Sequence, residues 1–212
     1  VLMEFAAAQL KRESLTLRAA ALRFLVRAVQ GAVPGAADLA RDACCDGSWA
    51  LKYLRDVALG QEEPCPPEVT SEIFLDNLKS STPWLLKEVN IRLLESQPQG
   101  DILHIAAHYS NLIKVSETVT VRYSAGESLL RIAPKLSYDQ RNEVAVELSK
   151  GLEVGQYEFS KYIPQCLGEF CLFLRPSELD EAIERLGQPL RSPNDSVVRG
   201  ALPTVGGIIE HY

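Results

Sequence analysis

The stretch SVVRGALPTVGGI, residues 196–208, places three glycines and a proline inside a segment whose apolar spacing predicts a helix. An interior glycine costs an isolated helix about 1 kcal/mol relative to alanine, and a proline costs about 3 kcal/mol. Local preference therefore disfavours this helix, and packing against other helices must stabilise it. Small residues allow helices to approach closely, so we expect a neighbouring helix to lie against Gly200, Ala201, Gly206 and Gly207.

The apolar pattern of this segment recurs upstream with a period of 38 residues. Four sets of positions share the spacing: Val121, Phe159 and Val197; Ala125, Ile163 and Ala201; Leu129, Leu167 and Val205; Ile132, Phe170 and Ile208. Within each copy these positions run i, i+4, i+8, i+11, which is one face of an α-helix. Each copy therefore contains a helix with one apolar face.

The segments between these helices repeat as well, first after 39 and then after 38 residues. The matching positions are Ile105, Val144 and Ala182; Ala106, Ala145 and Ile183; Tyr109, Leu148 and Leu186; Ile113, Leu152 and Leu190. A shorter copy lies upstream, where Leu85, Val89 and Leu93 precede Val121, Ala125 and Leu129 by 36 residues, with Thr82 as the expected N-cap and Pro83 at the first helical position. Strand patterns are nearly absent. The sequence predicts an all-α fold of repeated helix pairs.

This period and two-helix unit resemble the HEAT repeat, and residues 196–208 look like the inner helix of that family. The resemblance covers residues 70–212, and residues 1–60 more loosely. It implies a right-handed α-solenoid of stacked antiparallel helix pairs. One departure concerns the Asp that usually precedes the inner-helix Arg, because the corresponding positions are Ser116 and Gly155. The buried polar ladder of the family is therefore not expected here.

We predict one helical-repeat domain over residues 1–212, as a segment of a larger protein. Residues 1–60 read as degenerate helical pairs, with helices at 1–13, 16–30, 36–44 and 48–59, and residues 69–212 as the clearer repeats. The proline-rich stretch 61–68 is expected to be a loop inside the array. Pro203 and Pro164 fall within predicted helices, so we expect a bend near each.

Composition narrows the classes of function. The net charge of −6 disfavours nucleic-acid binding, which needs a concentration of Lys and Arg, although residues 11–27 carry a local positive bias. Five cysteines, two of them adjacent, do not suggest a disulfide framework, so we expect a reducing cytoplasm. No run of about 18 uncharged apolar residues occurs, so we expect no membrane insertion.

The pair His104 and His108 is the one candidate for metal chemistry. Imidazoles at i and i+4 share a helix face and can share a zinc ion, but Ile105 stands where the metalloprotease motif has its Glu base. The repeat register places Glu143 and Glu147 at the equivalent positions, which also suits a solvated helix face. We therefore expect no cofactor, and we keep the histidine pair as an alternative.

The sequence contains no nucleophile elbow and no glycine-rich phosphate loop. The HEAT resemblance implies a protein-binding scaffold or regulatory module that uses the concave face of its inner helices. The residues expected there are Lys87, Asn90, Arg122, Tyr123, Lys161, Tyr162, Gln165 and Arg199. The partner is expected to be a protein, or a second copy stacked on an open repeat end. The alternative is an enzyme or its helical accessory region, since some HEAT-like proteins act on DNA bases or attach bilin pigments.

Overall fold

The computed structural model describes residues 1–61, 69–95, 101–153 and 162–211. These residues form helices joined by turns and contain no strand, which confirms the all-α prediction. Contacts between Cα atoms divide the chain into two compact units, Val1–Gln99 and Gly100–Tyr212. Each unit is described by itself. The prediction of one domain over residues 1–212 stays a prediction.

Unit 1 contains six α-helices in its described residues. They are α1 (Leu2–Leu10), α2 (Leu15–Gln30), α3 (Ala36–Arg41), α4 (Trp49–Leu59), α5 (Ser71–Leu75) and α6 (Trp84–Glu95), with a 3₁₀ turn, η1 (Asp76–Leu78), after α5. The four helices expected before residue 60 are all present, although the first and third end three residues early. The predicted loop 61–68 lies outside the described residues except for Gln61.

Hydroxyl caps and glycines set the helix boundaries in this unit. Ser14 Oγ accepts from Leu17 N at 3.4 Å and Ser48 Oγ from Leu51 N at 3.3 Å, so each stabilises a free amide at a helix start. Gly60 ends α4 with φ +65°, a left-handed conformation that favours glycine. The start of α6 falls one residue later than expected, because the carbonyl of Pro83 accepts from the amides of Leu86 and Lys87.

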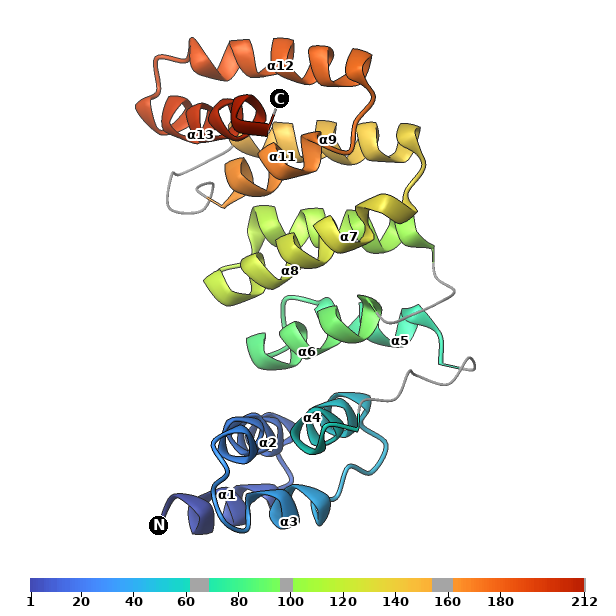
Figure 1. Ribbon diagram of the computed structural model, residues 1–212, viewed down its shortest axis with the longest axis vertical. Helices are drawn as coiled ribbons and strands as arrows, with labels where there is room; N and C mark the ends of the chain where they lie inside the picture. The colour runs from blue at the N-terminus through green and yellow to red at the C-terminus, as the bar shows by residue number, and fades with distance from the viewer. Residues whose placement is uncertain (62–68, 96–100, 154–161, 212) are drawn as a thin grey trace. The chain divides into compact units, whose positions relative to one another are not determined.

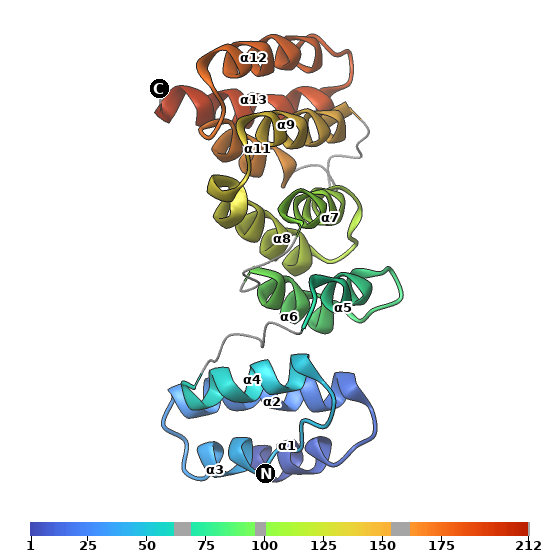
Figure 2. The ribbon, with the colours of Figure 1, turned by 90° about the vertical axis from the view of Figure 1, so that its right-hand side faces the viewer.

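The helices of unit 1 pack in layers. Helix α2 contacts α1, α3, α4 and α6. Figures 1 and 2 show α1 and α3 on one side and α2 and α4 on the other. The core between them is made of small and aliphatic side chains that are fully buried, including Ala19, Leu22, Leu25, Ala36 and Leu51.

Unit 2 is built from six described α-helices. They are α7 (Ile102–Val115), α8 (Val119–Ile132), α9 (Tyr138–Glu153), α11 (Ile163–Cys171), α12 (Pro176–Leu190) and α13 (Asp195–His211), with a 3₁₀ turn, η2 (Ala133–Lys135), after α8. Helix α9 contacts α7 and α12, and α11 contacts α8 and α13. Within unit 2 the helices therefore form two layers, α7, α9 and α12 in one and α8, α11 and α13 in the other (Figure 1).

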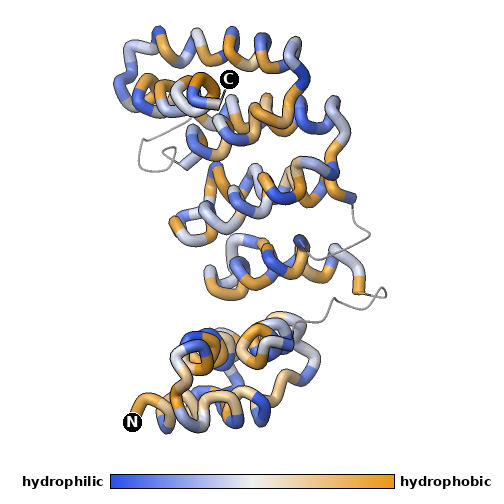
Figure 3. Tube along the Cα trace, in the orientation of Figure 1, coloured by the Kyte–Doolittle hydropathy of each residue, from blue (hydrophilic) through white to orange (hydrophobic). Residues whose placement is uncertain are grey.

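Burial in unit 2 follows the 38-residue register. Of the aligned positions, Val121, Ala125, Leu129 and Ile132 on α8 are all at most 3% exposed, and their described equivalents on α11 are equally buried. Figure 3 shows the corresponding alternation of hydrophobic and hydrophilic positions along these helices. The exceptions are on α12 and α13, where Ile183 is 42% exposed. Phe159 lies outside the described residues.

Two contacts repeat between successive helices of the second layer. Thr204 Oγ1 donates to the carbonyl of Pro164 at 3.2 Å, and Cys166 Sγ points to the carbonyl of Gly126 at 4.0 Å. Both pairs are 40 residues apart, and the second pair is the first shifted by 38. The sequence repeat thus corresponds to a repeated packing contact.

The expected close approach of α13 to its neighbour occurs, but not at every residue predicted. A Cβ built on Gly168 would lie 3.3 Å from the backbone oxygen of Thr204 and 3.8 Å from Gly207 Cα, so α11 and α13 touch through backbone atoms. Ala201 is fully buried, as expected. The prediction is wrong for Gly206, which has no atom within 4 Å of a built Cβ. Nothing is stated of the surroundings of Gly200.

The two prolines differ in position. Pro164 lies in the first turn of α11, where a proline removes no helical hydrogen bond, so the predicted bend at Pro164 is wrong. Pro203 does lie inside α13. The bend expected there stays a prediction.

One arginine connects the turns of unit 2. The guanidinium of Arg141 donates to the carbonyls of Ala133, Pro134 and Phe173 at 3.0, 3.0 and 3.1 Å. It also lies over the ring of Tyr138, at 4.8 Å from the centroid. Arg141 therefore joins the start of α9 to the turn η2 and to the segment after α11.

Candidate functional site

Four of the eight residues predicted to bind a partner line one groove in unit 2. Arg122 and Tyr123 come from α8, Tyr162 immediately precedes α11, and Gln165 lies on α11; together they border a groove of about 210 Å³. We call it the tyrosine groove. Its other lining residues are Gly126, Glu127, Leu130, Cys166 and Glu169. The groove lies between equivalent helices of neighbouring repeats.

The two tyrosines form the aromatic part of the groove. Their ring centroids are 4.8 Å apart and the ring planes meet at 66°, an edge-to-face arrangement. Tyr123 is 47% exposed and Tyr162 is partly exposed. A partner side chain can therefore reach both rings from solvent. Tyrosine suits this role because its ring is apolar and its hydroxyl can hydrogen-bond.

The base of the groove depends on close packing between α8 and α11. A Cβ built on Gly126 would lie 3.6 Å from Cys166 Sγ, so the glycine leaves room for the sulfur. Cys166 is buried, and this burial raises the pKa of its thiol to about 12. The thiol is therefore protonated at neutral pH and serves as an apolar packing group.

Carboxylates border the groove on both helices. Glu127 forms an ion pair with Arg131 at 3.0 Å, and Glu169 Oε1 accepts from Gln165 Nε2 at 3.3 Å. Both contacts join residues one turn apart on a single helix, so they orient the side chains without closing the groove. Neither glutamate was predicted. Glu127 could have been, because it lies 38 residues before Gln165.

Arg122 and Asn90 do not belong to an exposed surface. Each is 3% exposed, and Arg122 Nε donates to the backbone carbonyl of Ser116. Burial lowers the pKa of Arg122, against a smaller opposing effect of Tyr162. Asn90 Nδ2 donates to the carbonyl of Leu86 at 2.7 Å. We therefore withdraw both from the predicted binding surface, because their polar atoms hold the backbone of their own unit.

The remaining predicted residues lie elsewhere. Lys87, on α6 in unit 1, is partly exposed and donates to the Ser80 carbonyl at 3.4 Å. Arg199, on α13, is exposed and pairs with Asp195 at 3.3 Å, one turn away. Lys161 lies outside the described residues. The structure thus brings Tyr123, Tyr162 and Gln165 together and does not add Lys87 or Arg199 to them.

The described cysteines offer no activated nucleophile. Burial raises the pKa of Cys171 to about 11. Desolvation also raises the pKa of Cys45, although Arg55 opposes it. Cys44 is exposed, and its Sγ lies 2.6 Å from Asp46 Oδ2, a carboxylate that does not stabilise a thiolate. The four thiols are free of disulfides.

The histidine pair lies on α7. His104 Nε2 and His108 Nε2 are 3.2 Å apart, with ring centroids separated by 4.8 Å. Over residues 1–61, 69–95, 101–153 and 162–211, no group of three or more His, Cys, Asp or Glu could hold a metal. Glu147, at the equivalent repeat position, pairs with Lys114 and Lys150, and the hydrogen bond from Lys150 is the main reason that its pKa is lowered.

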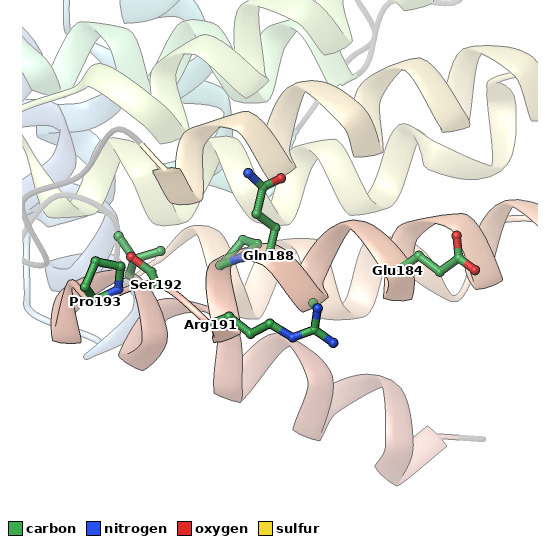
Figure 4. A pocket seen from close by; sticks show the side chains of 8 residues that line it. Glu184, Gln188, Arg191, Ser192 and Pro193 are labelled. Atoms are coloured by element: carbon green, nitrogen blue, oxygen red, sulfur yellow. The ribbon is translucent and has the colours of Figure 1, made fainter.

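A larger, open groove of about 790 Å³ lies at the turn between α12 and α13. Figure 4 shows its polar side chains Glu184, Gln188 and Arg191 pointing in different directions. Because they do not converge on one point, they do not form a catalytic arrangement. Among the described residues, no helix has the length and apolar character needed to cross a bilayer.

A third groove, of about 260 Å³, lies in unit 1 among α2, α4 and α6. Arg23 donates to Glu88 there at 3.2 Å and lies over the ring of Trp84, 5.4 Å from its centroid. Arg92 pairs with Glu95 at 3.0 Å. The positive bias read from the sequence is therefore partly neutralised within the unit.

Comparisons with known proteins do not extend these observations. No protein-family model matches the chain, and no curated protein matches it. One solved structure similar to it is the crystal structure of an engineered protein, a structural-genomics target, with 18% identity and a TM-score of 0.46; the alignment covers 98% of this chain and 96% of that chain. A likeness at this level carries no argument about family or function, so the function is argued from the tyrosine groove.

Proposed function

We propose that this chain is a non-catalytic protein-binding module, built as a right-handed α-solenoid of HEAT-like repeats, and that it binds its partner at the tyrosine groove. A cytoplasmic location, inferred from the cysteines, is part of the same proposal. The repeat period supports the solenoid, because the contacts Thr204–Pro164 and Cys166–Gly126 recur with the sequence register. Repeat arrays commonly bind partners on a surface formed by equivalent helices.

The observation that carries the proposal is the pair Tyr123 and Tyr162. Two rings in edge-to-face contact are held at the mouth of a groove, and Tyr123 leaves 47% of its surface in water. Exposed tyrosines that are fixed by packing lose little conformational entropy on binding, and tyrosine is enriched among interface residues that dominate affinity. Glu127, Gln165 and Glu169 supply the hydrogen-bonding rim that a protein interface needs.

A catalytic role has less support. The thiols of Cys166 and Cys171 have pKa values raised to about 12 and about 11, and the histidines on α7 have no convergent acid among the described residues. General acid-base or nucleophilic catalysis needs such groups within hydrogen-bonding reach of each other.

The test compares partner capture by the native chain with capture by Tyr123→Ala, Tyr162→Ala. Proteins recovered from an extract of the source cells are identified by mass spectrometry, and the affinity of the purified partner is then measured by titration. We expect the double variant to weaken binding at least tenfold, which is about 1.4 kcal/mol.

Two control variants sharpen the result. Tyr123→Phe, Tyr162→Phe keeps both rings and should retain most of the affinity. Tyr138→Ala removes a tyrosine of similar exposure, 51%, from α9 and should leave binding unchanged. A partner bound equally well by the native chain and by the Ala double variant would remove the tyrosine groove from the proposal. Equal loss in Tyr138→Ala would point to a general effect on the fold.

A further inference from the structure

The rings of His104 and His108 converge on one point beside α7. Asp101 Oδ1 accepts from the backbone amide of His104 at 3.0 Å and so caps the helix at its first turn. On the opposite face of the same two turns, Ile105, Ala106 and Tyr109 are at most 1% exposed. Capping and burial thus hold the backbone that carries both imidazoles, and their solvent-facing side is available to a ligand.

The separation of the two ring nitrogens matches that of two ligands on one metal ion. Zinc binds imidazole nitrogen at about 2.0–2.1 Å. Two nitrogens 3.2 Å apart, each at this distance from a common ion, subtend an angle of about 100° at the ion. This angle lies between the values for square-planar and tetrahedral coordination. Two histidines on one helix face need not converge in this way, since other side-chain rotamers would separate the rings.

We propose that His104 and His108 form a two-imidazole site for a divalent late transition-metal ion, with Zn²⁺ and Ni²⁺ as members of the class. Imidazole nitrogen suits these ions, whereas Mg²⁺ and Ca²⁺ prefer oxygen ligands. Because no larger cluster of metal-binding side chains exists among the described residues, water completes the coordination. The site therefore holds its ion exchangeably and is distinct from a closed structural zinc site.

Metal binding replaces the contact between the two rings. Without metal, one Nε2 donates its hydrogen to the lone pair of the other. With metal, both Nε2 lone pairs point to the ion, so the donor ring carries its proton on Nδ1 instead. No proton is gained or lost in this exchange when both rings are neutral.

The test is calorimetric titration of the full chain, free of any affinity tag, with ZnCl₂ and separately with NiCl₂. We expect one equivalent of metal to bind, and we expect His104→Gln and His108→Gln each to weaken binding at least tenfold. Both variants keep a polar side chain at an exposed or partly exposed position, so the helix content measured by circular dichroism should not change.

Other metal-binding side chains provide the controls. His211→Ala removes the third histidine of the chain, and Cys44→Ser, Cys45→Ser removes the adjacent thiols; both variants should retain the titration. Zn²⁺ should also shift the Nε2 resonances of His104 and His108 in ¹⁵N spectra. The proposal is overturned by the absence of binding, by binding that survives the double His→Gln variant, or by loss in only one of the two single variants. These results do not depend on the tyrosine groove.

Discussion

Alanine in place of Gly168 or Gly206 should have opposite effects on stability, although both glycines lie inside helices of unit 2. Each substitution removes the conformational cost of an interior glycine, which is worth up to about 1 kcal/mol. The difference between them comes from the space available. A Cβ at Gly206 meets no atom within 4 Å, so Gly206→Ala should stabilise the chain by up to about 1 kcal/mol.

At Gly168 the same methyl group meets backbone. It would lie 3.3 Å from the Thr204 oxygen and 3.7 Å from Thr204 Cα. Helix α13 holds that oxygen, and Thr204 is also tied to α11 by its bond to Pro164, so the neighbour cannot easily move. Overpacking of this kind costs about 1–3 kcal/mol, which exceeds the gain in helix preference. We expect Gly168→Ala to destabilise the chain by about 1 kcal/mol.

Urea denaturation followed by circular dichroism at 222 nm measures both effects. The two variants should differ by about 2 kcal/mol, or roughly 4–8 °C in thermal midpoint for a chain of this size. If both variants were equally stabilising, α11 and α13 would not be in backbone contact, and the packing attributed to the glycines of residues 196–208 would be refuted. A loss of stability in Gly206→Ala would show instead that this exposed face is covered.

Three further predictions follow from buried and charged groups. Thr204→Val keeps the shape of a fully buried side chain but removes its hydrogen bond to α11, so denaturation should show a loss of about 1–2 kcal/mol. At pH 8, iodoacetamide should label the exposed Cys44 in the folded chain but label Cys166, whose pKa is raised to about 12, only after unfolding; peptide mass spectrometry at equal labelling of both would contradict the burial of Cys166. The pKa of Glu178 is lowered, mainly by hydrogen bonds from Arg175, so its stabilising effect is present above the ordinary glutamate pKa of about 4.3 and is lost as the pH falls through the lowered value. Urea midpoints of the native chain and Glu178→Gln should therefore differ at pH 7 and converge in acid, and a constant difference would show that the carboxylate charge is not responsible.

Part of the tyrosine groove could be predicted because a repeat places equivalent residues on equivalent helix faces. Tyr123, Tyr162 and Gln165 follow from the register, and Glu127 is available from the same comparison. Register does not report depth, however. Arg122 precedes Tyr123 by one residue, yet its guanidinium turns inward to the Ser116 carbonyl. A hydrophilic residue beside an apolar face can either extend into solvent or satisfy a buried carbonyl, and only the surrounding backbone decides which.

The sequence by itself determined that the chain is helical and which faces are apolar, because helical periodicity and capping act over a few residues and are readable locally. It also determined the 38-residue period that relates α8, α11 and α13. The tertiary structure alone decided which glycine is packed, since Gly168 meets Thr204 across 36 residues and Gly206 meets nothing. It also decided that Pro164 begins a helix, that Asn90 and Arg122 are buried, and that the two rings on α7 converge. These outcomes depend on helix positions and side-chain rotamers, which are set by contacts between segments far apart in the chain.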